Sequence, residues 1–575
     1  MIFKWFNLIS YEAREVKINI LKKSVLFLLR TFRRPNSMKS NINLLPYGDA
    51  NIGKYLANGR YIFSGVEFDL DVDNPWLIEI PSPEVEQNLH GFFWLNDLAA
   101  LGNSKARSRA IDWISKWHFY SSFGKRIGWD ADMTALRCIN LLRNWHFLSK
   151  APDKIVQRNL KFLWRQYKFL GLMFPFYPAG LKKVKIGFSI VLLSLFFDVK
   201  VRIIKRNLKK LYQSIYQIID SNGQFLNRCP EDFLESFIII LDVLSIYEIE
   251  KLLSKNDLSG FQNLNNIMAP ILRGLRLGNG SLTRTHGGDI GFSGLIDHYL
   301  VASNVKSPPA ITNMLGFERI TAGRLILIVD CAKPSKGINM DNPHASCLSF
   351  ELSSGQRPIF VNCGPGGRFG AAFKRYCRST QAHNSCTLGD ISQLQYEFIS
   401  RRKRWPKEIV SHGPRNITVA REKTFEATWL NLSHDSYEKK YGYIHNRKLL
   451  VLNSGKAFTG TDSFETSKEN KIKAKKNINF YAYFQLHPDV ELWDHPRLQT
   501  IILRLKNGEH WIFESDLGTV NIEESTFINS TASRPQSTKR IVIKSSTLLN
   551  KTEIKWSLRR REIVTRNTRD FELVH

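Results

Sequence analysis

One stretch in the C-terminal half gathers side chains that can transfer protons and bind an anion. Among residues 434–447 are the imidazoles of His434 and His445, the phenols of Tyr437 and Tyr441, the carboxylate of Asp435 and the guanidinium of Arg447. Imidazole and phenol groups act as general bases and acids, and a guanidinium can clamp a carboxylate. We therefore take His434, Tyr437, His445 and Arg447 as candidate catalytic residues. The alternative is that they are ordinary turn and strand residues.

The spacing of two of these residues predicts their relative orientation. His445 and Arg447 are two positions apart in a run, YIHNRKLLVL, that is typical of a β-strand. Side chains two apart in a strand point to the same face of the sheet. We therefore expect the imidazole and the guanidinium on one face.

Helical periodicity dominates residues 84–305. Apolar residues recur there at three- and four-residue spacing, in segments such as KARSRAIDWISKWHFY and EDFLESFIIILDVLSIYEI. The strongly apolar run 186–197 is too short to span a bilayer and predicts a buried helix. Serial pairs of amphipathic helices of this kind suggest an α/α toroid.

The pattern changes after residue 305. Pro308 and Pro309 interrupt the helical period, which predicts a linker over 306–318. Short β-rich runs such as RLILIVDC and RPIFVNCG then follow to residue 575, separated by Gly, Asn, Asp and Ser. Helices followed by strands predict an α+β chain, with an antiparallel β-sandwich over 319–575. Residues 1–83 are expected to form an amphipathic helix and an extended segment.

The charge balance favours a polyanionic partner. The 575 residues include 82 Lys and Arg against 52 Asp and Glu, a formal net charge of +30. The positive electrostatic field of such a chain attracts nucleic acids, anionic membranes and acidic polysaccharides alike. A generic Lys-rich surface gives the same balance of charge. The sequence has no recognisable groove-reading or base-stacking motif, so nucleic acid is not the partner that we expect.

The N-terminus has neither a long apolar run nor a standard export signal. Its basic residues, Lys17, Lys22, Lys23, Arg30, Arg33 and Arg34, follow an amphipathic helical pattern. This helix is expected either to pack on the main body or to contact an anionic membrane peripherally. The seven cysteines include no CxxC pair, so most are interpreted as small buried residues.

Three sequence blocks, taken in order, resemble the heparinase II/III family of polysaccharide lyases. They are LHGFFWLNDLAALG with the later WDADMTALRCINLLRNW, then LRLGNGSLTRTHGG (275–288), and finally NPHASCLSFELSSGQRPIFVNCG (342–364) running into KRYCRSTQAHNSCTLGD (374–390). The resemblance implies a helical toroid followed by a β-sandwich, with a basic cleft between them. It also implies cleavage of a uronate-containing, heparin-like or alginate-like polysaccharide by β-elimination. That reaction removes the C5 proton, stabilises the carboxylate and protonates the leaving oxygen.

The resemblance further implies a zinc site in the β-domain, held by two histidines and an aspartate. The matching positions here are His344, His383 and Asn362, so the carboxylate is replaced by an amide. An Asn oxygen is a weaker zinc ligand, and Cys363 is a candidate to complete the set. Alternatively, the two histidines fix sandwich turns through hydrogen bonds. His383 is also taken as a candidate catalytic residue.

A second departure lies at Asn342, where relatives often have a catalytic histidine. We expect Asn342 to bind substrate, together with His286 in TRTHGGDIG and Arg137 in the helical half. Tyr177 and Arg228 are the nearest polar groups in the stretches where the family has its helical-domain catalytic residues, and both are interpreted as structural.

These observations predict a lyase that acts on an acidic polysaccharide. The alternative is a protein of the same architecture that only holds the polymer, for example during export or assembly of a cell-surface glycan. The family resemblance implies a location in the cell envelope or periplasm, whereas the missing export signal favours the cytoplasm.

Overall fold

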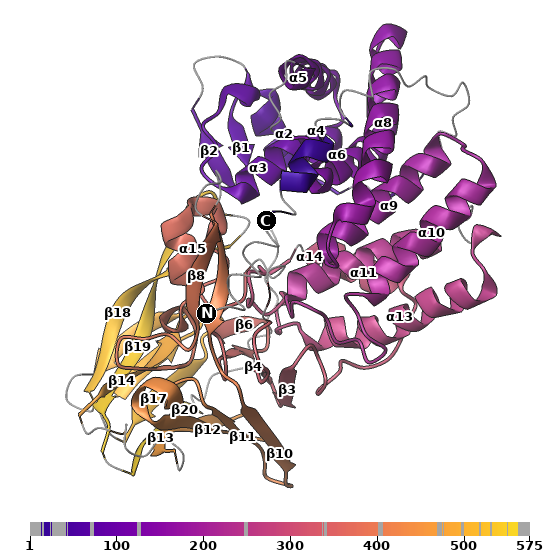
Figure 1. Ribbon diagram of the computed structural model, residues 1–575. Helices are drawn as coiled ribbons and strands as arrows, with labels where there is room; N and C mark the ends of the chain where they lie inside the picture. Colours follow the sequence, from indigo (N-terminus) through magenta and orange to yellow (C-terminus); the bar gives the residue numbers. More distant parts are fainter. Residues whose placement is uncertain are drawn as a thin grey trace.

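The structure is a computed structural model of the chain, shown in Figure 1. It describes residues 13, 16–22, 25, 42, 44, 45 and 47–561, except 70–73, 123–127, 247–250, 292, 336, 338–341, 401–405, 468–473, 475, 476, 496–499, 517, 518, 530, 531 and 549. Of the basic N-terminal residues, Lys17 and Lys22 are described. Lys22 is buried and pairs with Asp130 of the helical half. Lys23, Arg30, Arg33 and Arg34, on which the membrane prediction also depends, lie outside the described residues.

The N-terminal half is helical, as the periodicity predicted. Its described helices are α2 (Ala50–Ala57), α3 (Pro83–His90), α4 (Trp94–Leu101), α5 (Ser104–Ser122), α6 (Ala131–Arg143), α7 (Trp145–Leu148), α8 (Asp153–Met173), α9 (Leu181–Phe196), α10 (Val201–Tyr216), α11 (Pro230–Ser245), α13 (Lys255–Gly274) and α14 (Ser293–Ala302). A small hairpin, β1 (Tyr61–Phe63) and β2 (Val66–Phe68), precedes α3.

Local signals explain where several helices begin and end. The Ser82 hydroxyl accepts the main-chain N–H of Val85 at the start of α3, where Pro83 supplies a pre-set φ. Gly102 ends α4 in the left-handed region at φ +72°. The apolar run 186–197 lies almost wholly in α9 and is buried throughout, which confirms the predicted buried helix. None of the described helices is long and apolar enough to cross a bilayer.

The C-terminal half is built from antiparallel sheets (Figure 1). An eight-stranded sheet has the order β10-β11-β12-β13-β20-β17-β16-β15, and two four-stranded sheets have the orders β18-β19-β14-β7 and β3-β4-β5-β6. The bounds are β3 (Phe317–Ala322), β4 (Leu325–Asp330), β5 (Phe350–Ser354), β6 (Arg357–Phe360), β7 (Cys386–Leu388), β8 (Gln395–Ser400), β9 (Lys407–His412), β10 (Ile417–Lys423), β11 (Ala427–His434), β12 (Tyr443–Leu452), β13 (Ala457–Thr466), β14 (Asn479–Gln485), β15 (Glu491–His495), β16 (Thr500–Arg504), β17 (His510–Ser515), β18 (Thr519–Phe527), β19 (Gln536–Ser546) and β20 (Lys551–Arg560). Strands β8 and β9 form a separate hairpin, and α15 (Ala371–Cys377) and α16 (Glu438–Tyr441) are short helices between strands.

Each half has its own core. Rings from three sheets meet in the sandwich, where Phe350 lies 5.0 Å from Phe458 and Phe484 lies 4.9 Å from Trp556 between ring centroids. The helical core includes Leu56 and Phe63, so the segment before residue 84 packs with the toroid helices. All seven cysteines are buried and have free thiols.

The two halves meet through the chain between α13 and α14. Its main chain approaches the β5–β6 turn so closely that a Cβ added at Gly278 would lie 1.7 Å from the carbonyl oxygen of Gly355. The Gly278 N–H also donates to the Ser353 hydroxyl at 3.1 Å. This contact fixes the position of the polar residues 284–289 against the sandwich.

Candidate functional site

Buried polar residues meet where the 284–289 segment packs on the sandwich. We call His286, Asp330, Asn342, His344 and His383 the junction cluster. Asp330 ends β4, Asn342 and His344 lie between β4 and β5, and His383 precedes β7. The segment from the helical half contributes His286, with a left-handed φ of +52°. The structure thus brings together four residues that the sequence predicted separately.

The histidine pair in this cluster has a definite arrangement of protons. His383 Nδ1 lies 2.8 Å from the Ser379 carbonyl oxygen, which only accepts hydrogen bonds, so Nδ1 carries the proton. His383 Nε2 must then accept, and His344 Nδ1 donates to it at 3.1 Å. Both imidazoles are 1% exposed, and burial lowers the pKa of His383 to about 4 and that of His344 well below its ordinary value. His344 is therefore neutral, with the lone pair on Nε2.

His286 connects this pair to a buried ion pair between the two halves. Its Nδ1 accepts the main-chain N–H of His344 at 3.2 Å, and its Nε2 lies 3.3 Å from Asp330 Oδ2, within ion-pair distance. Asp330 also pairs with Arg228 from the helical half and accepts the Ser346 hydroxyl at 2.6 Å. Burial alone would raise the pKa of Asp330, but Arg228 and His286 outweigh burial and hold that pKa below its ordinary value. Asp330 is therefore an anion at neutral pH.

Asn342 is the partly exposed member of the junction cluster. Its amide packs on Gly287, where an added Cβ would lie 2.5 Å from Nδ2. Its Oδ1 is buried and has no hydrogen-bond partner, and the same is true of Thr285 Oγ1 and Arg284 Nη1 on the facing segment. An unpaired buried polar atom costs about 1–3 kcal/mol. Three such atoms at one junction indicate groups arranged for a ligand rather than for stability alone.

The predicted zinc ligands do not all converge. His344 and His383 supply two ring nitrogens, but the Asn362 amide is engaged elsewhere: Nδ2 donates to the Arg284 carbonyl at 3.1 Å, and Oδ1 accepts the Asn384 N–H at 3.4 Å. Cys363 Sγ donates to the Thr526 carbonyl oxygen at 2.9 Å and lies 3.5 Å from Cys377 Sγ. Zinc sites use at least three protein ligands. The residues present do not fit that requirement, so no metal enters the chemistry proposed below.

A buried acidic pair lies next to the cluster and was missed in the sequence. Glu231, in the first turn of α11, accepts the main-chain N–H of Asp289 at 3.0 Å. Burial, and then the charge of Asp289, raise the pKa of Glu231 to about 8, so its carboxyl is largely protonated at neutral pH. No specific signal in the sequence marks Glu231, because a carboxylate in the first turn of a helix is common as a partner of the helix dipole.

The proton-transfer candidates in residues 434–447 lie inside the sandwich. Strand β12 alternates buried and less buried positions, so His445 and Arg447 do share a face, and that face is the inner one. His434, Tyr437, His445 and Arg447 are each exposed by 1% or less. The Tyr437 hydroxyl donates to the Cys386 carbonyl oxygen at 2.7 Å. This placement corrects the interpretation of the four residues as catalytic, because their polar groups are paired with one another, with Asp462 and with main-chain atoms inside the sandwich.

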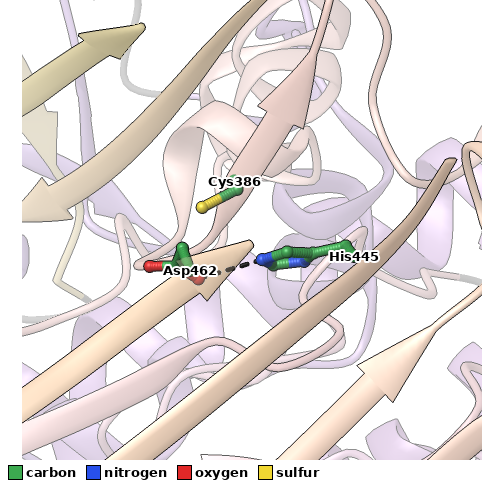
Figure 2. Close-up of side chains that lie close together, drawn as sticks. All are labelled: Cys386, His445 and Asp462. Atoms are coloured by element: carbon green, nitrogen blue, oxygen red, sulfur yellow. Dashed lines mark hydrogen bonds and ion pairs between the residues drawn. The ribbon is translucent and has the colours of Figure 1, made fainter. Parts of the chain in front are cut away.

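Asp462 lies at the centre of this second group. Figure 2 shows Asp462 beside His445 and Cys386. The aspartate accepts from His445 Nε2 at 2.9 Å, from Arg447 Nε at 2.6 Å and from Trp556 Nε1 at 2.9 Å. His434 Nε2 lies 3.1 Å from His445 Nδ1 and extends the network. We call His434, His445, Arg447 and Asp462 the sandwich cluster.

Cys386, His445 and Asp462 have ligand atoms within 4.8 Å of one another, the spacing of a metal site. The Arg447 guanidinium occupies the same space, with Nη2 at 3.0 Å from Asp462 Oδ2 and 3.6 Å from Cys386 Sγ. A fixed cation at this position repels a metal ion and already neutralises the carboxylate. The sandwich cluster is therefore a structural charge network.

The other predicted groups in the helical half are also internal. Arg137 is 0% exposed, donates to the carbonyl oxygens of His90 and Gly128 at 2.8 Å each, and stacks 4.2 Å from the Trp117 ring. Because it is enclosed in the toroid core, this corrects its interpretation as a substrate-binding residue. Arg228 and Tyr177 have the structural roles that were expected: Tyr177 accepts the Ala131 N–H at 3.0 Å.

A cavity of about 300 Å³ opens beside the junction, lined by Asn279, Gln356, Arg357, Pro358, His487, Asp489, Leu505 and Lys506. The His487 ring lies 5.1 Å from the ring of Phe527, on which Arg284 stacks at 4.3 Å. The cavity is therefore adjacent to the junction rather than at the histidines themselves.

Two solved structures share the fold of a helical half followed by an antiparallel sandwich. A heparinase III crystal structure matches with a TM-score of 0.69 at 12% identity, covering 96% of this chain and 91% of that one. Heparan sulfate lyase HepC from Pedobacter heparinus matches with a TM-score of 0.52 at 14% identity, covering 96% and 89%. These matches confirm the predicted fold.

The sequence comparisons identify the C-terminal half. Residues 306–557 match the model of the heparinase II/III-like C-terminal domain, which confirms the resemblance seen in residues 342–390. A curated relative, FtsZ-localized protein C of Caulobacter vibrioides (strain NA1000 / CB15N), is 24% identical over 525 residues, covering 89% of this chain and 88% of the relative.

Proposed function

We propose that this protein is a polysaccharide lyase that cleaves a uronate-containing acidic polysaccharide by β-elimination at the junction cluster. The observation that carries the proposal is the set of unpaired polar atoms on Arg284, Thr285 and Asn342, on both sides of the junction, within a heparinase III-like fold. The net charge of +30 supports an anionic substrate.

The proposed chemistry uses neutral groups. The Asn342 amide hydrogen-bonds the uronate carboxylate, and an imidazole with a free lone pair, His344, takes the C5 proton. The electron pair of the C5–H bond forms the C4–C5 double bond while the C4–O4 bond breaks. O4 takes up a proton from water, and the His344 imidazolium returns its proton to the resulting hydroxide, so the step is balanced. The His383 ring and the Ser379 carbonyl fix the tautomer of His344 that leaves Nε2 free. Asp330 holds His286 beside this pair.

The test is incubation with heparan-type, alginate and other uronate polymers while the ultraviolet absorbance of unsaturated uronate ends is followed. We expect a signal with at least one polymer, and we expect His344→Ala and Asn342→Ala to reduce it by about 10²-fold or more. His146→Ala, at an exposed histidine of α7 in the helical half, is the matched control. Undiminished product formation by His344→Ala would reject the placement of the site.

A non-catalytic polysaccharide-binding protein on the same scaffold is the second candidate. The observation that favours it is the 1% exposure of His344 and His383, together with Asn342 and Asn362 at positions where relatives have a histidine and an aspartate. Measurable polymer binding without any ultraviolet signal across the panel would select this function. Elemental analysis of the purified protein tests zinc separately, and stoichiometric zinc would contradict the metal-free chemistry.

The cellular place of the protein is also a proposal. The name of the Caulobacter relative states that it localises with FtsZ. We propose that this chain acts at the division site, on an acidic glycan of the cell envelope. Imaging a fluorescent fusion together with FtsZ tests this placement, and a uniform distribution in dividing cells would reject it.

A further inference from the structure

A straight row of cations runs along one face of α8. Its members follow each other at steps of four, three, four and three residues: Lys154, Arg158, Lys161, Arg165 and Lys168. At 3.6 residues per turn this spacing keeps all five on one face, and 14 steps of 1.5 Å give a row of about 21 Å. Lys154, Arg158 and Lys161 are exposed, and the other two are partly exposed.

Helix α10 carries a second row. Its cations are Arg202, Lys205, Arg206, Lys209 and Lys210, and the first four are exposed. The opposite face of α10 is apolar and turned into the toroid core, with Ile204, Leu208, Leu211 and Ile215 buried. The two rows therefore belong to the outer wall of the toroid. We call these ten cations the basic wall.

Helices α8 and α10 both pack against α9, and they approach each other near Tyr167 and Phe174. Asn207 and Arg206 of α10 lie close enough to Tyr167 of α8 to lower the pKa of that phenol, although the larger effect of burial raises it overall. At the end of α8, Lys210 reaches over the ring of Phe174 at 5.8 Å. The two rows therefore lie on the solvent-facing sides of helices that approach each other.

Helices α8 and α10 themselves carry almost no negative charge. Helix α8 has one acidic residue, Asp153, in its first turn, and α10 has none. Among the described ion pairs, none involves Lys154, Lys161, Lys205 or Lys209. Like charges three or four residues apart repel one another and destabilise a helix. An external polyanion that neutralises these cations relieves the repulsion.

The chemistry of the surface selects among polyanions. A helix that lies in a membrane presents apolar residues to the lipid, whereas the apolar faces of α8 and α10 are buried in the toroid. Single-stranded nucleic acid is held by exposed aromatic rings, and α8 exposes no Trp, Tyr or Phe in the row between Lys154 and Lys168. A hydrophilic chain with regularly repeated charges fits both observations.

We propose that the basic wall binds a long acidic polysaccharide outside the junction, so that the protein holds an extended stretch of its substrate polymer. This inference rests on the proposed function for the identity of the polymer. The wall adds affinity for long chains and adds nothing for an oligosaccharide that only fills the junction, because the added contacts require a chain that reaches both places.

The experiment compares two full-length variants with the same net charge. The wall variant is Lys154→Gln, Lys161→Gln, Lys205→Gln and Lys209→Gln combined. The control removes four exposed lysines from other surfaces, with Lys54→Gln, Lys306→Gln, Lys423→Gln and Lys448→Gln combined. Binding of fluorescent long-chain heparin and alginate is measured by anisotropy at several salt concentrations, and thermal unfolding verifies that both variants are folded.

We expect the wall variant to lose about tenfold or more in affinity for the better polymer, and its slope of log K against log salt to decrease by about 3. The control should keep the affinity within about twofold, and binding of a uronate disaccharide should not change. Equal losses in both variants, or no loss in the wall variant, would overturn the proposal. So would wall-dependent binding of phosphatidylglycerol vesicles or duplex DNA in place of the polysaccharides.

Failure of the proposed lyase activity gives a different result. If the ultraviolet assay shows no product but long-chain binding still depends on the wall, the enzyme proposal fails and the wall proposal stands. If product forms but the wall variant binds long chains normally, the wall proposal fails and the enzyme proposal stands.

Discussion

At the scale of single residues, the two clusters differ in whether their polar atoms are all paired. In the sandwich cluster each Asp462 oxygen accepts at least two donors, and the Arg447 charge is compensated in place. The junction cluster leaves Asn342 Oδ1 unpaired. Complete pairing in a buried network serves stability, whereas an incomplete set is typical of a place that binds something else.

This contrast predicts that Asp462 acts on stability. Asp462→Ala leaves the Arg447 guanidinium buried without its carboxylate, which costs about 3–5 kcal/mol of the free energy of unfolding. Chemical denaturation of wild type and variant measures the difference. Asn342→Ala serves as the comparison, since it should change unfolding by less than about 1 kcal/mol while it reduces turnover. An Asp462→Ala protein of normal stability and lower turnover would restore the catalytic interpretation of this cluster.

The His383 imidazole predicts a pH dependence of stability. Its pKa is about 4 in the folded protein because of burial, against about 6.5 when unfolded. The unfolded state thus binds more protons between these values, so the stabilisation is complete above about pH 6.5 and is lost as the pH falls toward 4. The shift corresponds to about 3 kcal/mol. Unfolding of His383→Gln should show a flatter pH profile over this window, and parallel profiles would contradict the assignment.

At the scale of elements, the sequence predicted which side chains share a face but not which face is covered. Period-two alternation correctly paired His445 with Arg447 on β12. Only the packing of β12 in an eight-stranded sheet, against β5 and β14, decides that this face is interior. The junction histidines were predicted better, because family resemblance carries information on long-range contacts that periodicity lacks. Asp330 and Glu231 belong to the same region, but a carboxylate at a strand end or a helix start is too common to stand out.

The close contact of Gly278, between α13 and α14, with Gly355 predicts the effect of a small substitution. Gly278→Ala places a methyl group 1.7 Å from the Gly355 carbonyl oxygen, a backbone atom that cannot turn aside. We expect a loss of about 1–3 kcal/mol in stability and a lower turnover, because residues 284–289 shift against the sandwich. Gly171→Ala in α8, where an added Cβ meets nothing within 4 Å, should instead stabilise by about 0.5–1 kcal/mol. Thermal unfolding of the pair measures both effects, and a Gly278→Ala protein with wild-type stability would contradict the described contact.

At the scale of the whole molecule, the order of helices before strands was enough to predict two segregated halves, while the way in which they are held together was not predictable. Arg228 reaches from the helical half to Asp330 and donates to the carbonyl oxygens of Leu315 and Ala332 at 2.7 and 2.9 Å. Its left-handed φ of +59° is required for that reach. Nothing in the sequence NRCPED distinguishes this arginine from the many others in a chain of net charge +30.

Removing the ion pair between Arg228 and Asp330 should distinguish catalysis at the junction from polymer binding at the basic wall. Arg228→Gln leaves Asp330 buried without its guanidinium, so we expect a loss of about 3–5 kcal/mol in stability and a displaced His286. Turnover should then fall together with hydrogen-exchange protection of residues 284–289 and 344–348. The basic wall lies on α8 and α10 within the helical half, away from this contact, so affinity for long-chain polymer should change by less than about twofold. Hydrogen exchange and anisotropy on the same preparation test this division, and parallel loss of turnover and long-chain affinity would show that junction and wall act as one site.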